Sequence, residues 1–212
     1  MSKRSAVWTE RVLLATGALL IAGWAAVILE ARAFGLRQER RLERMTASSS
    51  AGPASVRTSK NAKRTAGSRS ALAPQDLVGR IEIPRLRLRA IVAEGVSART
   101  LRLAVGHLPG TALPGDDGNV VLAAHRDTFF RPLQDVRPGD TVAVTTPEGR
   151  FEYMVEDTHV VEPTRTDLLE ADKEPTLTLV TCYPFHLIGN APDRFVVRAR
   201  QVSSLTASSS SP

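Results

Sequence analysis

The hydrophobic positions of this chain follow two patterns, one uninterrupted and one alternating. The uninterrupted pattern covers residues 12–29, which lie between Arg11 and Glu30 and include no charged residue. A helix over this stretch is about 27 Å long, close to the thickness of the hydrocarbon core of a membrane. We therefore predict a transmembrane signal anchor over residues 12–29, preceded by a short basic tail over residues 1–11.

Two other interpretations of this stretch are a buried globular helix and a cleavable signal peptide. A chain this short has no second layer that could bury a helix apolar on every side. Ala31-Arg32-Ala33 mimics a small-residue cleavage site, but the apolar stretch exceeds the usual length of about 7 to 15 residues. The basic residues around it are Lys3, Arg4 and Arg11 before, and Arg32, Arg37, Arg40, Arg41 and Arg44 after. By the positive-inside rule this distribution favours a cytoplasmic C-terminus.

Residues 30–74 read as a helical extension followed by a basic linker. Over residues 30–45, Glu39 and Glu43 lie next to basic residues or four positions from them, as in a solvated helix. Residues 46–74 are rich in Ser, Ala, Gly and Thr and contain basic but no acidic residues, which predicts a flexible, self-repelling tether. A polybasic clamp on anionic lipid or wall polymer is the functional alternative. The net charge of +6 does not indicate nucleic-acid binding, because no aromatic residue interleaves these charges.

The alternating pattern begins near Asp76 and predicts strands separated by short turns. We expect a folded domain over residues 75–203 and a disordered Ser-rich tail over residues 204–212. Ser97 is the expected N-cap of one short helix. The predicted strands are 77–84, 86–92, 119–125, 141–145, 150–161, 176–182 and a run starting near 195, with the short helix at 98–106 and a short helical or irregular crossing at 129–136. Helices long enough for crossovers are missing, so a mostly β fold with a closed barrel of about seven strands is expected.

Cys182 is the only cysteine in the chain and lies at the end of a strand-like run. A single cysteine excludes an intramolecular disulfide and a Cys-rich zinc site. Many lone cysteines are simply small buried hydrophobes, and that interpretation stays open from composition alone. A second β run begins directly after Arg194, so two neighbouring strands could carry a thiol and a guanidinium at one end of a sheet.

A thiol nucleophile needs a proton partner, and the chain has four histidines. His186 is close to the cysteine in sequence, but loop neighbours rarely project toward each other. His107 lies among glycines and prolines, and His159 lies in the middle of a predicted strand. His125 ends a strand expected to be buried on both faces, so a rigid element would hold it while its tip meets solvent. His125 is therefore a candidate proton carrier, and from periodicity alone a purely structural histidine stays open as the alternative.

Residues 178–182, Thr-Leu-Val-Thr-Cys, resemble the TLxTC signature of sortases, the cysteine transpeptidases that attach proteins to bacterial cell envelopes. Arg194 falls where that family has its arginine. The segment GNVVLAAHRDTFF resembles the sortase strand and loop that carry the catalytic histidine, and CYPFHLIGNAPDRFVV looks most like class D sortases. The resemblance covers nearly all of residues 76–202 and implies the eight-stranded sortase barrel.

The resemblance implies a role for each selected residue. Cys182 would be the nucleophile, His125 the general acid and base, and Arg194 the clamp on the oxyanion or substrate. Thr181 would add a hydroxyl donor near the thiol, or only pack within its strand. The strand from Phe151 and the loop 164–173 would border a peptide groove.

The implied substrate is a secreted protein with an LPxTG-like motif near its C-terminus. The acyl group would pass through a thioester to an amine, such as a peptidoglycan precursor or a pilin lysine. Water as acceptor would make the same fold a cysteine protease, and a non-catalytic envelope-binding β domain with a buried Cys182 is a third function. These alternatives stay open.

Sortases resembling this chain act outside the cytoplasmic membrane, and we follow the resemblance over the charge count in placing the catalytic domain there. The chain would then be a single-pass protein of the cell membrane. We expect no cofactor, no metal and no nucleic-acid partner. The acidic loop residues lack the ligand spacing of a calcium site: Asp116, Asp117, Glu170 and Asp172.

Overall fold

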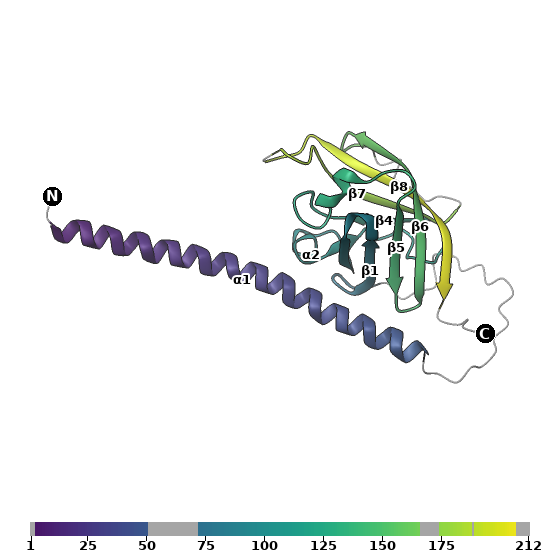
Figure 1. The fold of residues 1–212 in the computed structure, drawn as a ribbon, viewed down its shortest axis with the longest axis horizontal. Helices are drawn as coiled ribbons and strands as arrows, with labels where there is room; N and C mark the ends of the chain where they lie inside the picture. The colour runs from purple at the N-terminus through teal and green to yellow at the C-terminus, as the bar shows by residue number, and fades with distance from the viewer. Residues whose placement is uncertain (1–2, 51–71, 166–173, 188, 207–212) are drawn as a thin grey trace.

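The computed structural model describes residues 3–50, 72–165, 174–187 and 189–206. Within them one long helix precedes a β-barrel (Figure 1). The elements are α1 (Lys3–Ser50), β1 (Leu77–Ile83), η1 (Pro84–Leu86), β2 (Leu88–Glu94), α2 (Ala98–Leu103), β3 (Val105–His107), β4 (Asn119–Ala123), η2 (Arg131–Asp135), β5 (Thr141–Thr146), β6 (Gly149–Val161), β7 (Thr176–Tyr183) and β8 (Asp193–Thr206).

The strands close into a barrel in the order β1-β2-β3-β4-β7-β8-β6-β5, with β5 returning to β1. Neighbours are antiparallel except for β2 with β3 and β4 with β7, which run parallel. Apolar side chains from every part of the ring fill the interior; Ile81, Leu122, Val144 and Leu177 are each at most 1% exposed. The predicted closed, mostly β barrel is confirmed; it has the eight strands that the resemblance implies, one more than the roughly seven counted from the alternating pattern.

The strand missed by the sequence pattern is β3. We predicted one helix over 98–106, and its start is confirmed: the Thr100 amide donates to the Ser97 hydroxyl at 3.2 Å. The helix ends at Leu103, however, and the next residues pair with β2 and β4 instead. Gly106 permits this packing, since a Cβ there would lie 2.4 Å from the Gly95 carbonyl oxygen. Barrel closure thus overrides the local helical pattern.

Other boundaries shift by a few residues. The predicted strand at 86–92 is observed as β2 over Leu88–Glu94, because Pro84 starts a short 3-10 turn and Arg87 adopts a left-handed conformation with φ of +51°. Pro84 therefore marks a bend, as expected. The predicted crossing at 129–136 is the short η2 helix.

The helix α1 is continuous through the predicted anchor and extension. It reaches Ser50, so residues 46–50 are helical and not part of a flexible tether, and the first proline of the sequence, Pro53, comes only afterwards. The rest of the predicted linker, residues 51–71, lies outside the described residues. In the described part of the chain, α1 is the one helix long and apolar enough to cross a membrane, and its apolar stretch is not buried against the barrel.

The second half of α1 packs along the barrel, while the first half extends away from it (Figure 1). Leu42 is only 1% exposed and packs against β1, β2 and the end of α2; its partners are Leu77, Ile91, Ala93 and Ala104, with Phe34 beside them. Glu39 forms ion pairs with Arg89 and, at 3.5 Å, with Arg80. The acidic residue predicted to pair along the helix surface therefore pairs with the barrel.

Candidate active site

The selected histidine and cysteine follow two adjacent parallel strands. In the β4–β7 register, Ala123 lies opposite Val180, and the Ala124 amide continues this pairing by donating to the Val180 carbonyl at 3.3 Å. His125 and Cys182 each lie two residues beyond that pair. Parallel strands end at the same edge of a sheet, so the topology brings these two residues to one end of the barrel.

Arg194 belongs to β8, which pairs with β7 on the side away from β4. β7 and β8 are antiparallel, and their register places Cys182 directly opposite Arg194. Side chains of directly paired residues point to the same face of a sheet. A pocket of about 400 Å³ collects all three selected residues; its lining is His125, Arg126, Asp127, Cys182, Gly189, Asn190, Ala191 and Arg194.

His125 is exposed, although its backbone is firmly held. Its carbonyl oxygen accepts hydrogen bonds from the amides of Thr128, at 3.4 Å, and Phe130, at 3.2 Å. Phe130 is completely buried in the core and anchors this turn. The imidazole is thus presented to the pocket from a turn fixed by packing.

The thiol of Cys182 is half-buried, so it is not sealed inside the barrel. Three aromatic rings, from the end of β7, the following turn and the start of β8, pack together near this position in the chain. Phe185 and Phe195 meet edge to face with ring centroids 5.3 Å apart, and Tyr183 stacks on Phe195 at 6.4 Å. These contacts fix the backbone on the C-terminal side of Cys182, where β7 ends and the turn begins.

Arg194 is also half-buried, and the carbonyls of its own loop hold its guanidinium. One terminal nitrogen donates to the Asp193 carbonyl at 3.0 Å and to the Ala191 carbonyl at 3.4 Å. A guanidinium has five donors in a fixed planar arrangement, so an arginine held in this way can present further N–H groups to an anionic oxygen.

The Thr181 hydroxyl does not face the pocket. Thr181 is 2% exposed, and its hydroxyl donates to the Ala124 carbonyl at 2.8 Å. Its only proton is therefore used between β7 and β4. Of the two roles considered for Thr181, this geometry favours the structural one: the bond links the residue before Cys182 to the residue before His125.

Sequence reasoning missed Arg126. Its side chain is 8% exposed and donates to three carbonyls in the β7–β8 turn: Pro184 at 3.0 Å, Leu187 at 2.8 Å and Gly189 at 2.6 Å. Gly189 lines the pocket beside Cys182, so Arg126 holds one of the pocket walls. An arginine next to a catalytic-type histidine reads in sequence as a solvated charge, and only the fold shows that it is buried.

The other histidines lie elsewhere. His107 is 2% exposed in β3, where it pairs with Glu94 at 2.6 Å, and not in a loop as its neighbours suggested. His159 lies in β6, as predicted, and pairs with Asp157 at 2.9 Å. His186 is exposed and lines a neighbouring pocket of about 350 Å³, which shares Arg126 with the first pocket but includes neither His125 nor Cys182.

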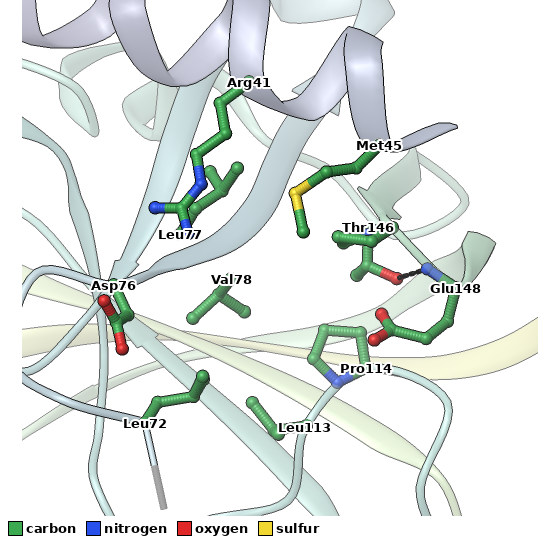
Figure 2. A pocket seen from close by; sticks show the side chains of 11 residues that line it. Arg41, Met45, Leu72, Asp76, Leu77, Val78, Leu113, Pro114, Thr146 and Glu148 are labelled. Atoms are coloured by element: carbon green, nitrogen blue, oxygen red, sulfur yellow. Dashed lines mark hydrogen bonds between the residues drawn. The ribbon is translucent and has the colours of Figure 1, made fainter. Parts of the chain in front are cut away.

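A third pocket, of about 200 Å³, lies where α1 meets the barrel (Figure 2). Arg41 and Met45 point from the helix toward Leu77 and Val78 of β1. Its lining is largely apolar and includes neither a cysteine nor a histidine, so it is a packing seam and not a site of thiol chemistry.

Among the described residues, no group of three or more His, Cys, Asp or Glu side chains is arranged to hold a metal ion. Glu170, Asp172 and most of the loop 164–173, expected to border the groove, lie outside the described residues.

Comparison with known proteins agrees with this geometry. Residues 81–202 match the family model described as a sortase domain. Sortase D of Bacillus subtilis is 32% identical over 155 residues, which cover 71% of this chain and 78% of that protein. Sortase A of Listeria monocytogenes is 29% identical over 110 residues, or 50% of this chain and 49% of that protein.

Solved structures show the same similarity. The Clostridium perfringens sortase D5 transpeptidase superimposes with a TM-score of 0.57 at 30% identity, over 62% of this chain and 82% of that one. The Listeria monocytogenes sortase A structure gives a TM-score of 0.57 at 25% identity, over 61% and 90%. The predicted likeness to class D sortases is confirmed.

Proposed function

Because the chain belongs to the sortase family of cysteine transpeptidases, we propose that it cleaves an LPxTG-like sorting motif and transfers the acyl group to an amine. The alignment of Cys182 with Arg194 across β7 and β8, with His125 ending the adjacent β4, is the observation that carries this proposal. The pocket that these residues share is open to solvent, as a peptide substrate requires.

In the first half of the reaction, the Cys182 thiolate attacks the carbonyl carbon of the scissile peptide bond. The carbonyl oxygen becomes an oxyanion, and Arg194 donates N–H groups to it. This contact strengthens as negative charge develops, so it lowers the barrier more than it strengthens substrate binding.

His125 supplies the proton that the departing amine needs. When the carbon–nitrogen bond breaks, the imidazolium protonates the leaving nitrogen and the acyl group remains on sulfur as a thioester. In the second half the neutral imidazole removes a proton from the incoming amine, which attacks the thioester and releases the thiolate. The cycle thus consumes no net proton.

Residues other than the three reacting groups hold these groups in position. Thr181 ties β7 to β4 beside the reacting pair, and Arg126 holds the turn that contributes Gly189 to the pocket lining. Holding a nucleophile, an acid and a clamp in register reduces the entropy cost of reaching the transition state.

The apolar stretch of α1 supports membrane anchoring. In the proposed arrangement it crosses the cell membrane once and the barrel lies outside the cytoplasm. The partners are secreted proteins with a C-terminal sorting motif and an amine acceptor on the envelope or on a pilin.

Mass spectrometry of the detergent-solubilised full chain, incubated with a sorting peptide and an added amine, tests the proposal. An amide-linked product supports transpeptidation. Release of the free acid alone would make the protein a hydrolase, and absence of both products would indicate a non-catalytic envelope-binding domain.

A further inference from the structure

We infer that α2 and the adjoining part of α1 form a docking face for anionic phospholipid headgroups, which holds the catalytic end of the barrel at the membrane surface. This inference rests on the anchoring part of the proposed function. It concerns Arg32, Arg99 and Arg102, none of which lines the catalytic pocket.

The ion pair between Glu30 and Arg99 indicates the level of α2 relative to the membrane. Glu30 is the first residue after the apolar stretch, and its carboxylate accepts a hydrogen bond from Arg99 of α2 at 3.2 Å. The headgroup region extends about 5 to 8 Å beyond the hydrocarbon on each side of a membrane. When residues 12–29 span the hydrocarbon, α2 therefore lies in the headgroup layer.

The barrel cannot swing away from this position without breaking contacts along α1. Leu42 is packed against the barrel about 18 Å further along the helix axis than Glu30. Glu39, between them, pairs with Arg80 and Arg89. The helix and barrel are thus in contact at several separated points, and these contacts fix the orientation of the barrel relative to α1.

The charge of this face matches an anionic surface. The Arg99 side chain is 60% exposed despite its pairing with Glu30, and Arg32 and Arg102 are exposed as well. Residues 95–105, which include α2, contain no acidic residue. Arginines at the level of the headgroups are attracted to the negative surface potential of anionic lipids.

The catalytic pocket lies on the same side of the barrel. In Figure 1 the β7–β8 turn points toward the side from which the apolar half of α1 extends. Gly189, Asn190 and Ala191 of this turn line the pocket with Cys182. Docking of α2 on lipid would therefore keep the thiol close to the headgroups, where a peptide attached to a membrane-anchored chain is presented.

Lipid retention tests the headgroup contact directly. The full chain is reconstituted in nanodiscs of phosphatidylcholine mixed equally with phosphatidylglycerol, and native mass spectrometry then counts the lipids that stay bound. We expect phosphatidylglycerol to be retained over phosphatidylcholine, and this preference to be lost in the Arg99→Gln, Arg102→Gln double variant. The control Arg40→Gln, Arg44→Gln removes the same charge about 15 and 21 Å beyond Glu30 and should keep the preference. Equal retention of both lipids by the unaltered chain, or equal loss in both variants, would overturn the inference.

The position of the pocket is measured through the single thiol of the chain. A fluorescent donor on Cys182 should transfer energy efficiently to acceptors on the lipid headgroups. Leu42→Asp, which separates α1 from the barrel, should lower that efficiency. An efficiency insensitive to Leu42→Asp would show that α1 does not hold the barrel in place. Turnover of a soluble sorting peptide by unlabelled chain in detergent tests the proposed chemistry separately, since neither lipid nor docking is needed there.

Discussion

His107 ends β3, His125 follows the end of the neighbouring strand β4, and the two histidines have opposite surroundings. Both ring nitrogens of His107 are occupied: Nδ1 pairs with Glu94 at 2.6 Å, and Nε2 donates to the Ala112 carbonyl at 2.9 Å. His125 lies beyond the end of β4, exposed, in a pocket with a thiol. A histidine saturated by buried partners holds structure together, whereas one that is held by its backbone and exposed at its ring can exchange protons.

The largest effect expected from this comparison is on catalysis at His125. His125→Ala removes the only proton carrier proposed for the leaving and entering amines, so turnover should fall by about 10³-fold or more. Cys182→Ala should abolish turnover altogether. Steady-state assay with a sorting peptide and an amine measures both, and thermal unfolding should show little change.

His186→Ala is the matched control, because His186 is also exposed and also close to the β7–β8 turn but lines the neighbouring pocket. It should retain most of the activity. Equal losses at the two histidines would contradict the assignment of His125.

His107→Ala should lower the free energy of unfolding and leave catalysis unchanged. It leaves the Glu94 carboxylate, 8% exposed, without its partner, and a buried charge stripped of its pair costs about 3 kcal/mol of unfolding free energy. Urea denaturation measures this loss. Turnover per folded molecule should stay near that of the unaltered chain.

The control is His159→Ala, whose partner Asp157 is exposed, so stability should change by about 0.5 kcal/mol at most. A loss of turnover in His107→Ala without a loss of stability would contradict the structural role given to buried His107 and the catalytic role given to exposed His125.

A smaller effect is expected at Arg126, which stands beside His125 yet is bonded as fully as His107. Arg126→Ala removes three hydrogen bonds to the β7–β8 turn, so hydrogen exchange at the amides of residues 185–187 should speed up and kcat/KM should fall about tenfold. Arg131→Ala removes an exposed arginine from the neighbouring pocket and should change neither measurement. Unchanged exchange in Arg126→Ala would show that the turn is held by other contacts.

The comparison also shows what sequence could and could not predict. The position of His125 just beyond a strand end was predictable, because a continuous apolar strand followed by a polar residue marks a strand end, and the resemblance of GNVVLAAHRDTFF to the sortase histidine segment singled that residue out. The role of His107 was not predictable. Its partner Glu94 is on β2, and only the short strand β3, formed by pairing on both sides, brings the two together. Local patterns report periodicity along the chain, but they carry no information on such pairings between distant segments.

For the same reason, the contacts of Arg126 and of α1 with distant segments could not be predicted from the sequence. Arg126 has an ordinary charged neighbourhood in sequence, and its three carbonyl partners are 58 to 63 residues away. The helical extension after the apolar stretch was readable from composition, whereas its contacts with Arg80 and Arg89 required the folded barrel.

The smallest expected effect, at Thr181, separates the two roles considered for that residue. Thr181→Val keeps the side-chain shape and removes the hydroxyl that donates to Ala124, so unfolding free energy should fall by about 1 kcal/mol. Turnover should fall only a few-fold, because the lost bond aligns β7 with β4 but does not touch the substrate. Thr181→Ser, which keeps the hydroxyl, should restore the pairing of the two strands. If Thr181→Val loses activity as severely as His125→Ala while keeping its stability, the hydroxyl belongs to the reacting groups and not to the strand pairing that positions them.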